Sequence, residues 1–189
     1  DMTTENSKLK VQLDTFMQET EVKTIDLEMA NQKLTSEKTN LQLEYNKLSQ
    51  ENKLGQAQTL KNESEWKAAA EVLNNIAIND LKEEKQVVYE ELKKSVYPKA
   101  GDAFYSEGNS LFKQENYIDA MIQFEKTLLY VPHTKTAANA LYNMGQIEEK
   151  NNNNNKALQY YTILAKDYEG TSAYYKAKER IKQLTPEES

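Results

Sequence analysis

Leucine recurs every seven residues along the first part of the chain. The rungs of this ladder are Leu13, Thr20, Leu27, Leu34, Leu41 and Leu48. The positions three residues before the rungs mix polar and apolar side chains: Lys10, Met17, Thr24, Asn31, Lys38, Tyr45 and Asn52. A helix with so narrow an apolar stripe cannot bury it alone, so this leucine-zipper-like pattern predicts a coiled coil with other helices.

The predicted seam also carries polar side chains that select how the helices pair. Its members are Leu13, Met17, Leu27, Asn31, Leu34, Leu41, Tyr45, Leu48 and Asn52. An Asn inside a seam weakens it but penalises wrong registers, because an unpaired buried amide costs about 1–3 kcal/mol. The seam therefore favours a parallel homo-oligomer, with a dimer as the first expectation and a trimer as the second.

Gly55 occupies the rung after Leu48, and the spacing changes beyond it. Apolar positions then recur every eleven residues, at Trp66, Ala77 and Val88 and at Ala70, Leu81 and Leu92. Such a period removes or reverses the left-handed supercoil of a coiled coil. Gly55 thus marks either a phase break in one rod over residues 1–97 or the C-cap of a helix that turns back. The rod is favoured, because no Pro or Asn-Gly turn follows.

Glycine and proline are unevenly distributed along the 189 residues. Residues 1–97 contain one Gly and no Pro, whereas the remainder contains four Gly, three Pro and nine of the 12 Tyr. Compact domains need a turn every 10–20 residues or so, and the first stretch has almost no residues that favour turns. We therefore predict an all-α protein that divides near residues 97–101 into a long helix and a second, unlike domain.

The second domain contains an internal repeat with a period of 37 residues. Gly108 precedes Ala120 by 12 positions, and Gly145 precedes Ala157 by the same interval. Small residues allow two antiparallel helices to approach closely, so Gly108 is expected to face Ala120 and Gly145 to face Ala157. Larger side chains are expected to fill the space around these crossings: Phe104, Leu111, Phe124, Leu141 and Tyr161.

This pattern resembles the tetratricopeptide repeat. The first copy matches the family at Phe104, Gly108, Leu111, Tyr117, Ala120, Phe124 and Pro132. The second copy has Asn154 in place of the turn Tyr and Glu169 in place of Pro. The resemblance implies a helix-pair solenoid over 101–184, with repeats at 101–134 and 138–171 and a capping helix at 173–184.

The combination of an N-terminal coiled coil with lengthened C-terminal repeats resembles the periplasmic CpoB/YbgF family of the Tol–Pal division machinery. That likeness implies a location in the bacterial cell envelope, outside the cytoplasmic membrane, with the cytoplasm as the alternative. The chain departs from the family in having only two full repeats and a longer coiled coil.

In tetratricopeptide solenoids the first helix of each pair lines a concave groove that binds peptides. The family pattern assigns this groove to Tyr105, Asn109, Phe112, Lys113, Asn139, Tyr142, Gln146 and Glu149. Asn and Gln amides pair with a peptide backbone, and aromatic rings add contact area at little entropic cost. Tyr105 replaces the Lys of a carboxylate clamp, so recognition of a partner's C-terminus is not expected.

Composition excludes several other functions. The chain has no Cys and a single His, His133, so neither a thiolate nucleophile nor a Cys- or His-ligated metal site is expected. A net charge of −6 argues against nucleic-acid binding, which requires clustered cations. No apolar run is long enough for a membrane span. The adjacent carboxylates Glu148 and Glu149 diverge on a helix, so no enzyme and no cofactor are predicted.

The sequence therefore predicts a non-enzymatic oligomeric scaffold. The coiled coil would oligomerise and space the molecule, while the repeats would dock a protein or peptide partner. The alternative is a structural rod, in which the repeats serve as a packing module of a larger assembly.

Overall fold

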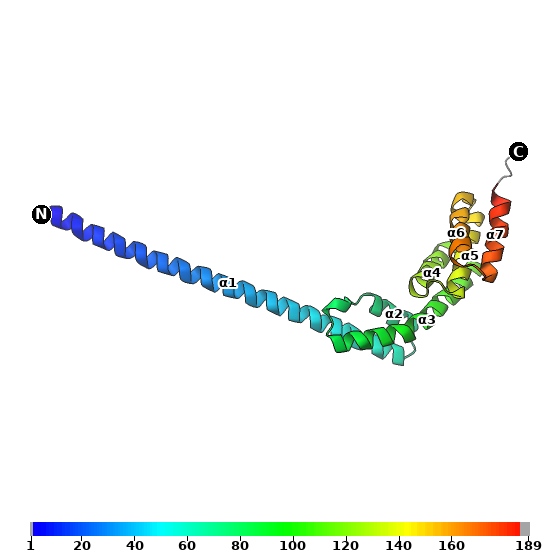
Figure 1. The fold of residues 1–189 in the computed structure, drawn as a ribbon, viewed down its shortest axis with the longest axis horizontal. Helices are drawn as coiled ribbons and strands as arrows, with labels where there is room; N and C mark the ends of the chain where they lie inside the picture. The colour runs from blue at the N-terminus through cyan, green and yellow to red at the C-terminus, as the bar shows by residue number, and fades with distance from the viewer. Residues whose placement is uncertain (1, 186–189) are drawn as a thin grey trace. The chain divides into compact units, whose positions relative to one another are not determined.

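The computed structural model describes residues 2–185, and within this range the chain is helical, with no β-strand. The predicted all-α class is thus confirmed. The elements are α1 (Met2–Asn62), α2 (Trp66–Asn74), the 3-10 helix η1 (Ile78–Asp80), α3 (Glu83–Lys113), α4 (Tyr117–Tyr130), α5 (Lys135–Lys150), α6 (Asn154–Asp167) and α7 (Ser172–Leu184) (Figure 1). None of these helices is long and apolar enough to cross a bilayer.

The chain forms two compact units that divide after Ser49. The first unit is the N-terminal part of α1, a single helix whose side chains are almost all exposed. Threonine hydroxyls donate hydrogen bonds to the carbonyl four residues earlier, for example Thr20 to Phe16 at 2.7 Å. The second unit, from Gln50 onward, contains every buried side chain of the described residues. We call this second unit the hairpin block.

The expected rod over residues 1–97 does not form, because α1 ends at Asn62. The chain turns through Ser64, which has a positive φ of 64°. The Ser64 N–H donates to the Lys61 carbonyl at 3.1 Å, and the Glu65 N–H donates to the Leu60 carbonyl at 2.8 Å. These two bonds make a Schellman C-cap, built without glycine.

The expected C-cap at Gly55 is wrong, since the residue lies inside α1 and the helix continues to Asn62. The phase break at Gly55 stays a prediction. The reversal comes later and is stabilised by burial of Leu54 and Ala57 against Leu73 of α2. The Lys53 ammonium donates to the Asn75 carbonyl at 3.0 Å, so α2 returns alongside the end of α1. The apolar residues at eleven-residue spacing lie in α2, beside η1 and in α3, so this spacing does not belong to one helix.

α3 runs uninterrupted through the expected domain boundary at residues 97–101. A Pro inside a helix removes one hydrogen bond and costs about 3 kcal/mol. Pro98 is tolerated because α3 packs along its length, first on α2 and then on α4 and α5. Its buried residues Val96, Ala100 and Phe104 share one apolar cluster with α2. The division lies instead after Ser49, where burial begins.

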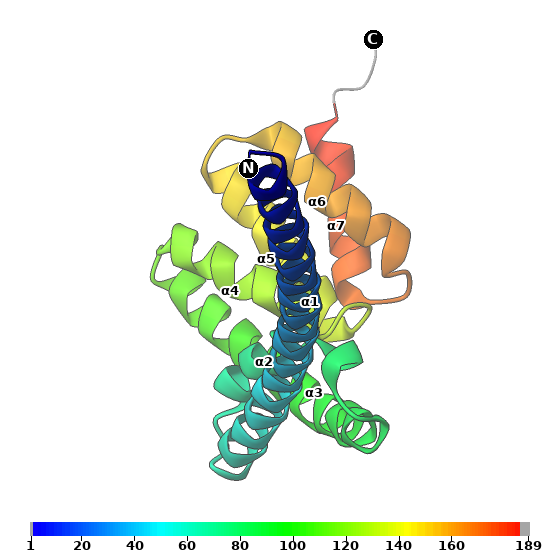
Figure 2. The ribbon, with the colours of Figure 1, turned by 90° about the vertical axis from the view of Figure 1, so that its left-hand side faces the viewer.

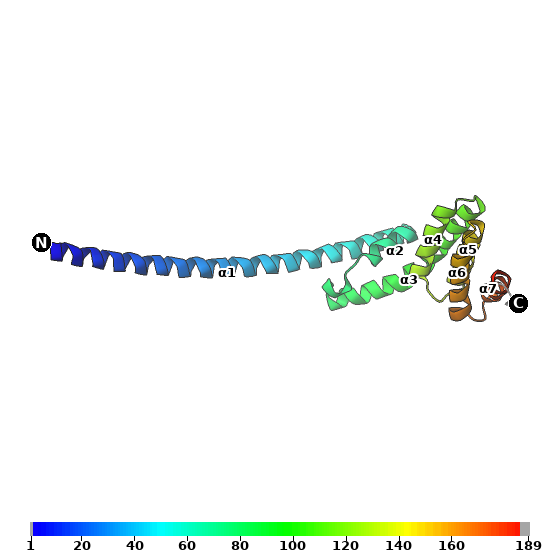
Figure 3. The ribbon, with the colours of Figure 1, turned by 90° about the horizontal axis from the view of Figure 1, so that it is seen from above.

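The helices after residue 97 repeat their backbone every 37 residues. α4 and α6 have bounds that differ by this interval, and so do the ends of α3 and α5. The turn inside each pair has a positive φ, 60° at Glu115 and 62° at Asn152. Each pair is followed by an N-cap threonine, Thr134 for α5 and Thr171 for α7, whose hydroxyl accepts a backbone N–H at 3.1 Å. Figures 2 and 3 show α4, α5, α6 and α7 packed side by side in the order in which they follow along the chain.

The end of α1 and α2 form a first hairpin of the same geometry. Three residues separate the two helices, as they separate α3 from α4 and α5 from α6. Ala57 lies seven residues before the positive-φ residue Ser64, and Ala69 lies five after it. Gly108 and Ala120 have these positions around Glu115 in the second hairpin. The hairpin block therefore contains three such hairpins, followed by α7.

Ionic contacts attach the first hairpin to the others. Lys67 of α2 pairs with Glu107 of α3. Lys126 of α4 lies 2.5 Å from Glu71 of α2. The Lys99 ammonium of α3 lies 3.9 Å from the centre of the Trp66 ring, a cation–π contact.

The glycines at the helix crossings face aromatic rings and not the expected alanines. A Cβ atom at Gly108 would lie 2.8 Å from Phe124 Cε1, and one at Gly145 would lie 2.4 Å from Tyr161 Cε1. The correction has a simple reason, because a ring one helical turn beyond Ala120 or Ala157 reaches back over the crossing. In the first hairpin the equivalent residues are Ala57 and Leu73, both buried.

Candidate interaction surfaces

The leucine rungs lie on the surface of the first unit. Leu13, Leu27, Leu34, Leu41 and Leu48 are each between 57% and 65% exposed. The seam residues Met17, Asn31, Tyr45 and Asn52 are exposed as well. Fully burying one leucine side chain stabilises a protein by about 1.5–3 kcal/mol, and none of this stabilisation is realised in the single chain.

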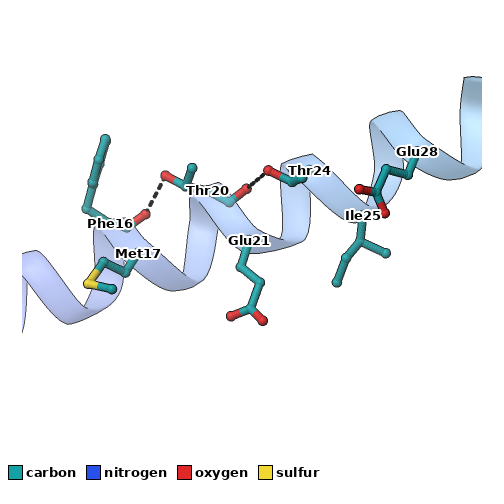
Figure 4. Close-up of a pocket in the computed structure, with 7 residues that line it drawn as sticks. All are labelled: Phe16, Met17, Thr20, Glu21, Thr24, Ile25 and Glu28. Carbon is teal, nitrogen blue, oxygen red and sulfur yellow. Dashed lines mark hydrogen bonds between the residues drawn. The ribbon is translucent and has the colours of Figure 1, made fainter.

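A shallow groove runs along the same helix between its side-chain ridges. Figure 4 shows Phe16, Met17 and Ile25 projecting from the helix surface around Thr20 and Thr24. Glu21 and Glu28 form its acidic edge. The groove is a surface of one helix, so it offers a docking strip for another helix and not an enclosed ligand site.

A second surface is formed by the first helix of each later hairpin together with α7. We call it the A face; α3 contacts α5, and α5 contacts α7. The Thr136 hydroxyl of α5 donates to the Asp102 carboxylate of α3 at 2.9 Å. Tyr105 of α3 shares a side-chain hydrogen bond with Asn143 of α5. These bonds fix the spacing of the A-face helices.

One aromatic pair occurs twice between an A-face helix and the second helix of its hairpin, at positions 37 residues apart. The rings of Tyr105 and Phe124 are 5.9 Å apart at an angle of 42°, and those of Tyr142 and Tyr161 are 5.7 Å apart at the same angle. Burial raises the pKa of Tyr105, while the hydrogen bond with Asn143 lowers it. Burial also raises the pKa of Tyr161, and neighbouring Tyr142 adds to the increase. Both hydroxyls are therefore neutral at physiological pH, and that of Tyr161 donates to Glu149.

Glu149 is the centre of a polar cluster on the A face. The Tyr161 hydroxyl donates to its Oε1 atom at 2.5 Å, and the Arg180 guanidinium of α7 pairs with both carboxylate oxygens. A bidentate guanidinium–carboxylate pair fixes geometry as well as charge. The cluster borders a concavity of about 270 Å³, lined by Tyr142, Gln146, Glu149, Lys150 and Arg180.

The structure brings together only part of the predicted groove. Tyr142, Gln146 and Glu149 line the concavity, and Tyr105 and Asn109 lie half-buried on the adjacent α3. Phe112 is half-buried, as Tyr105 is, and its ring lies 5.9 Å from that of Tyr117. Lys113 and Asn139 are exposed.

Sequence reasoning missed two α7 residues on this surface. Arg180 closes the Glu149 cluster, and the Lys176 ammonium lies 5.6 Å from the centre of the Tyr142 ring. A signal was present, because Arg180 is the only arginine among the 189 residues and follows Asn143 by one repeat period. The tetratricopeptide resemblance predicts a capping helix for residues 173–184, and capping helices are not expected to supply groove residues.

A further concavity of about 610 Å³ lies beside the turn between α3 and α4. Its lining includes exposed Ile118, Met121 and the buried carboxylate Glu148, which accepts a hydrogen bond from the Asn153 amide at 2.8 Å. Across residues 2–185 no three His, Cys, Asp or Glu side chains cluster in a way that could hold a metal ion.

The chain matches no known family model and no curated protein.

Proposed function

We propose that this protein is a non-enzymatic scaffold whose N-terminal helix oligomerises and whose hairpin block docks a protein or peptide partner. The helix hairpins are of the tetratricopeptide type in this proposal, and the A face is their binding groove. Following the family resemblance, the protein acts in the bacterial cell envelope, outside the cytoplasmic membrane, with the cytoplasm as the alternative.

The exposed leucine row carries the proposal. Five leucines at heptad spacing are more than half exposed, and isolated helices gain little stability from backbone bonds alone. Pairing with a second copy buries these side chains and stabilises the helix at the same time. A parallel homodimer is the first expectation, and a trimer is the second.

The A face has the chemistry of a peptide groove. Gln146 and Asn109 present amides that can pair with an extended backbone, and Tyr105 and Tyr142 offer rigid rings. The Glu149–Arg180 pair gives the groove a fixed polar end. Oligomerisation raises the effective concentration of these grooves, so that weak individual contacts add to strong binding.

A peptide-display selection on the full-length protein tests the docking role. Recovered peptides would be labelled and titrated against wild type, Asn109→Ala, Gln146→Ala and the control Gln159→Ala. Gln159 is an exposed glutamine on α6, away from the A face. We expect the two A-face variants to weaken binding about 10-fold each and the control to bind as wild type does. Equal binding by all four proteins would contradict an A-face groove.

The alternative role is a structural rod in which the A face packs against other subunits. The contact of the Phe112 ring with Tyr117 of α4 supports it, because this ring packs against its own block. The variants Tyr105→Ala and Asn109→Ala separate the two roles when their mass is measured by sedimentation. A scaffold keeps its oligomeric mass when Tyr105→Ala or Asn109→Ala is introduced, whereas a packing module loses mass.

A further inference from the structure

The end of α1 has one face that its own chain covers and one that it leaves open. Leu54 and Ala57 are buried and Lys53 is half-buried, on the side where α2 returns. The exposed residues are Asn52, Gly55, Gln56, Thr59 and Asn62. At 3.6 residues per turn they span an arc of about 120° on the opposite side of the helix.

This open face coincides with the heptad register of the sequence. Counting on from the rung at Leu48, Gly55 occupies the next rung, and Asn52 and Thr59 occupy the companion positions. Within the first hairpin, the α1 residues that contact α2 stand at neither the rungs nor the companion positions of the heptad. The chain has thus placed its returning helix where it does not obstruct a partner helix on the seam.

We infer that the open face at Asn52, Gly55 and Thr59 packs against the same face of a second copy of this chain, in parallel and in register. The inference rests on the proposed oligomeric function and extends its seam into the hairpin block. Gly55 is then a rung without a side chain, at which the two helices meet, and not a phase break or a turn. Each copy keeps α2 on the side of α1 away from the other copy.

Charge complementarity supports a parallel second copy as the occupant. In a parallel coiled coil the residue just before a companion position faces, on the other helix, the residue just after the following rung. Lys23 and Glu28 stand at such positions, so the Lys23 ammonium of one copy meets the Glu28 carboxylate of the other. Beside the open face Glu51 already pairs with Lys82 at 3.3 Å, so it adds no unpaired charge to this flank.

Asn52 supports the same register. In-register pairing places the Asn52 amides of the two copies against each other, where each satisfies the other, and a register shifted by one heptad opposes Asn52 with Tyr45 or Thr59. Gly55 leaves room for close approach, because a Cβ atom there would have no heavy atom within 4 Å in its own chain. A side chain added at Gly55 therefore meets only solvent or a second copy.

Disulfide trapping in the full chain tests the inference, since the protein has no Cys of its own. Single variants Leu41→Cys, Asn52→Cys, Gly55→Cys and Thr59→Cys would be equilibrated in a glutathione redox buffer. Lys61→Cys, on the covered side of the same helix, is the control. We expect covalent dimers at all four seam positions and at least about 10-fold fewer at Lys61, because a disulfide needs Cα atoms within about 7 Å.

The pattern of linkage separates the possible failures. Linkage at Leu41 without linkage at Asn52, Gly55 and Thr59 would overturn the extension and leave the proposed oligomer intact. No linkage at any position, with a monomeric mass, would remove both. Linkage at only one of Asn52, Gly55 and Thr59, and at none of the other positions, would indicate an antiparallel pair, in which identical residues meet only at the centre, and would also overturn the inference.

A second measurement uses Gly55 itself. Gly55→Ala and Gly55→Leu both fit the single chain, so the difference between them reports on the other copy. We expect Gly55→Leu to continue the leucine ladder and tighten the dimer at least about 10-fold relative to Gly55→Ala in sedimentation equilibrium. Equal dissociation constants for the two variants would show that the face stays in solvent.

Discussion

The first unit and the hairpin block are both made of helix, but they differ in what covers their apolar side chains. Leu34 of the first unit is 64% exposed, whereas Leu73 of the block is fully buried. The block covers its helices by turning the chain back through Ser64, Glu115 and Asn152. The first unit has no such turn. Helix formation and burial are therefore independent properties of this sequence.

A substitution in the leucine row is expected to have the largest effect, which is on the dissociation constant of the proposed dimer. Leu41→Lys places like charges against each other in the proposed seam, so we expect the dimer dissociation constant to rise about 100-fold. Sedimentation equilibrium measures this change. The matched control is Leu43→Lys, since Leu43 is also exposed but lies off the ladder. If Leu43→Lys weakened association as much as Leu41→Lys does, exposed leucines in general and not the ladder would drive it.

The crossing glycines test how tightly the block is packed. Gly145→Ala drives a Cβ into the Tyr161 ring, so we expect a loss of about 1–3 kcal/mol in the free energy of unfolding by urea. Gly55→Ala meets open space and should instead raise helix stability by up to about 1 kcal/mol.

A compensating change sharpens this comparison. The first hairpin combines Ala57 with Leu73 where the third combines Gly145 with Tyr161. Gly145→Ala combined with Tyr161→Leu reproduces the first pairing and should recover part of the lost stability. No recovery would show that the loss in Gly145→Ala does not come from the ring.

Ion pairs should differ between the two regions as well. Arg180 and Glu149 in the block are 35% and 15% exposed, whereas Lys33 and Glu37 in the first unit are 79% and 57% exposed. A double-mutant cycle with Arg180→Gln and Glu149→Gln should give a coupling energy of about 1–2 kcal/mol. The same cycle at Lys33 and Glu37 should give about 0.3 kcal/mol, and equal values would contradict the difference in burial.

The smallest effect at neutral pH concerns buried tyrosines of the block. Burial, together with the charge of Glu71, raises the pKa of Tyr130 to about 12, and burial also raises the pKa of Tyr97. The folded state therefore holds these protons more tightly than the unfolded state, whose tyrosines ionise near pH 10 or so. Stability is unaffected below that pH and falls as the pH rises towards about 12.

Circular dichroism and tyrosinate absorbance, followed together in alkaline titrations, measure this loss. We expect loss of helix from the block to coincide with ionisation of its buried tyrosines. Tyr130→Phe keeps the ring and removes the proton, so it should shift the alkaline transition to higher pH. An unchanged transition in Tyr130→Phe would show that Tyr130 does not contribute to it.

The expectation of one rod over residues 1–97 was wrong because the chain turns at a residue that is neither Gly nor Pro. The scarcity of Gly and Pro before Pro98 predicts that the chain does not turn there. The structure turns at Ser64, Glu115, His133 and Asn152, all with positive φ and none of them glycine. A non-glycine residue pays about 1–2 kcal/mol for this conformation, and the packing of paired helices offsets that cost. Such turns leave little trace in composition.

Much of the candidate site was accessible from the sequence. The tetratricopeptide resemblance assigned Tyr142, Gln146 and Glu149 to the groove, and these three side chains line one concavity. The resemblance could not show that Phe112 packs against Tyr117 or that Arg180 reaches Glu149 from α7. Both depend on which neighbouring helix lies closest, and a repeat pattern carries no such information.

The sequence by itself determined the helical class, the heptad register of the leucines and the 37-residue period, because each is a local periodicity of side chains along one chain. Only the tertiary structure decided where α1 ends, which face of its last turns α2 covers and which residues surround Glu149. These features arise from contacts between segments far apart in sequence. Their free energy depends on packing in three dimensions, which no linear pattern records.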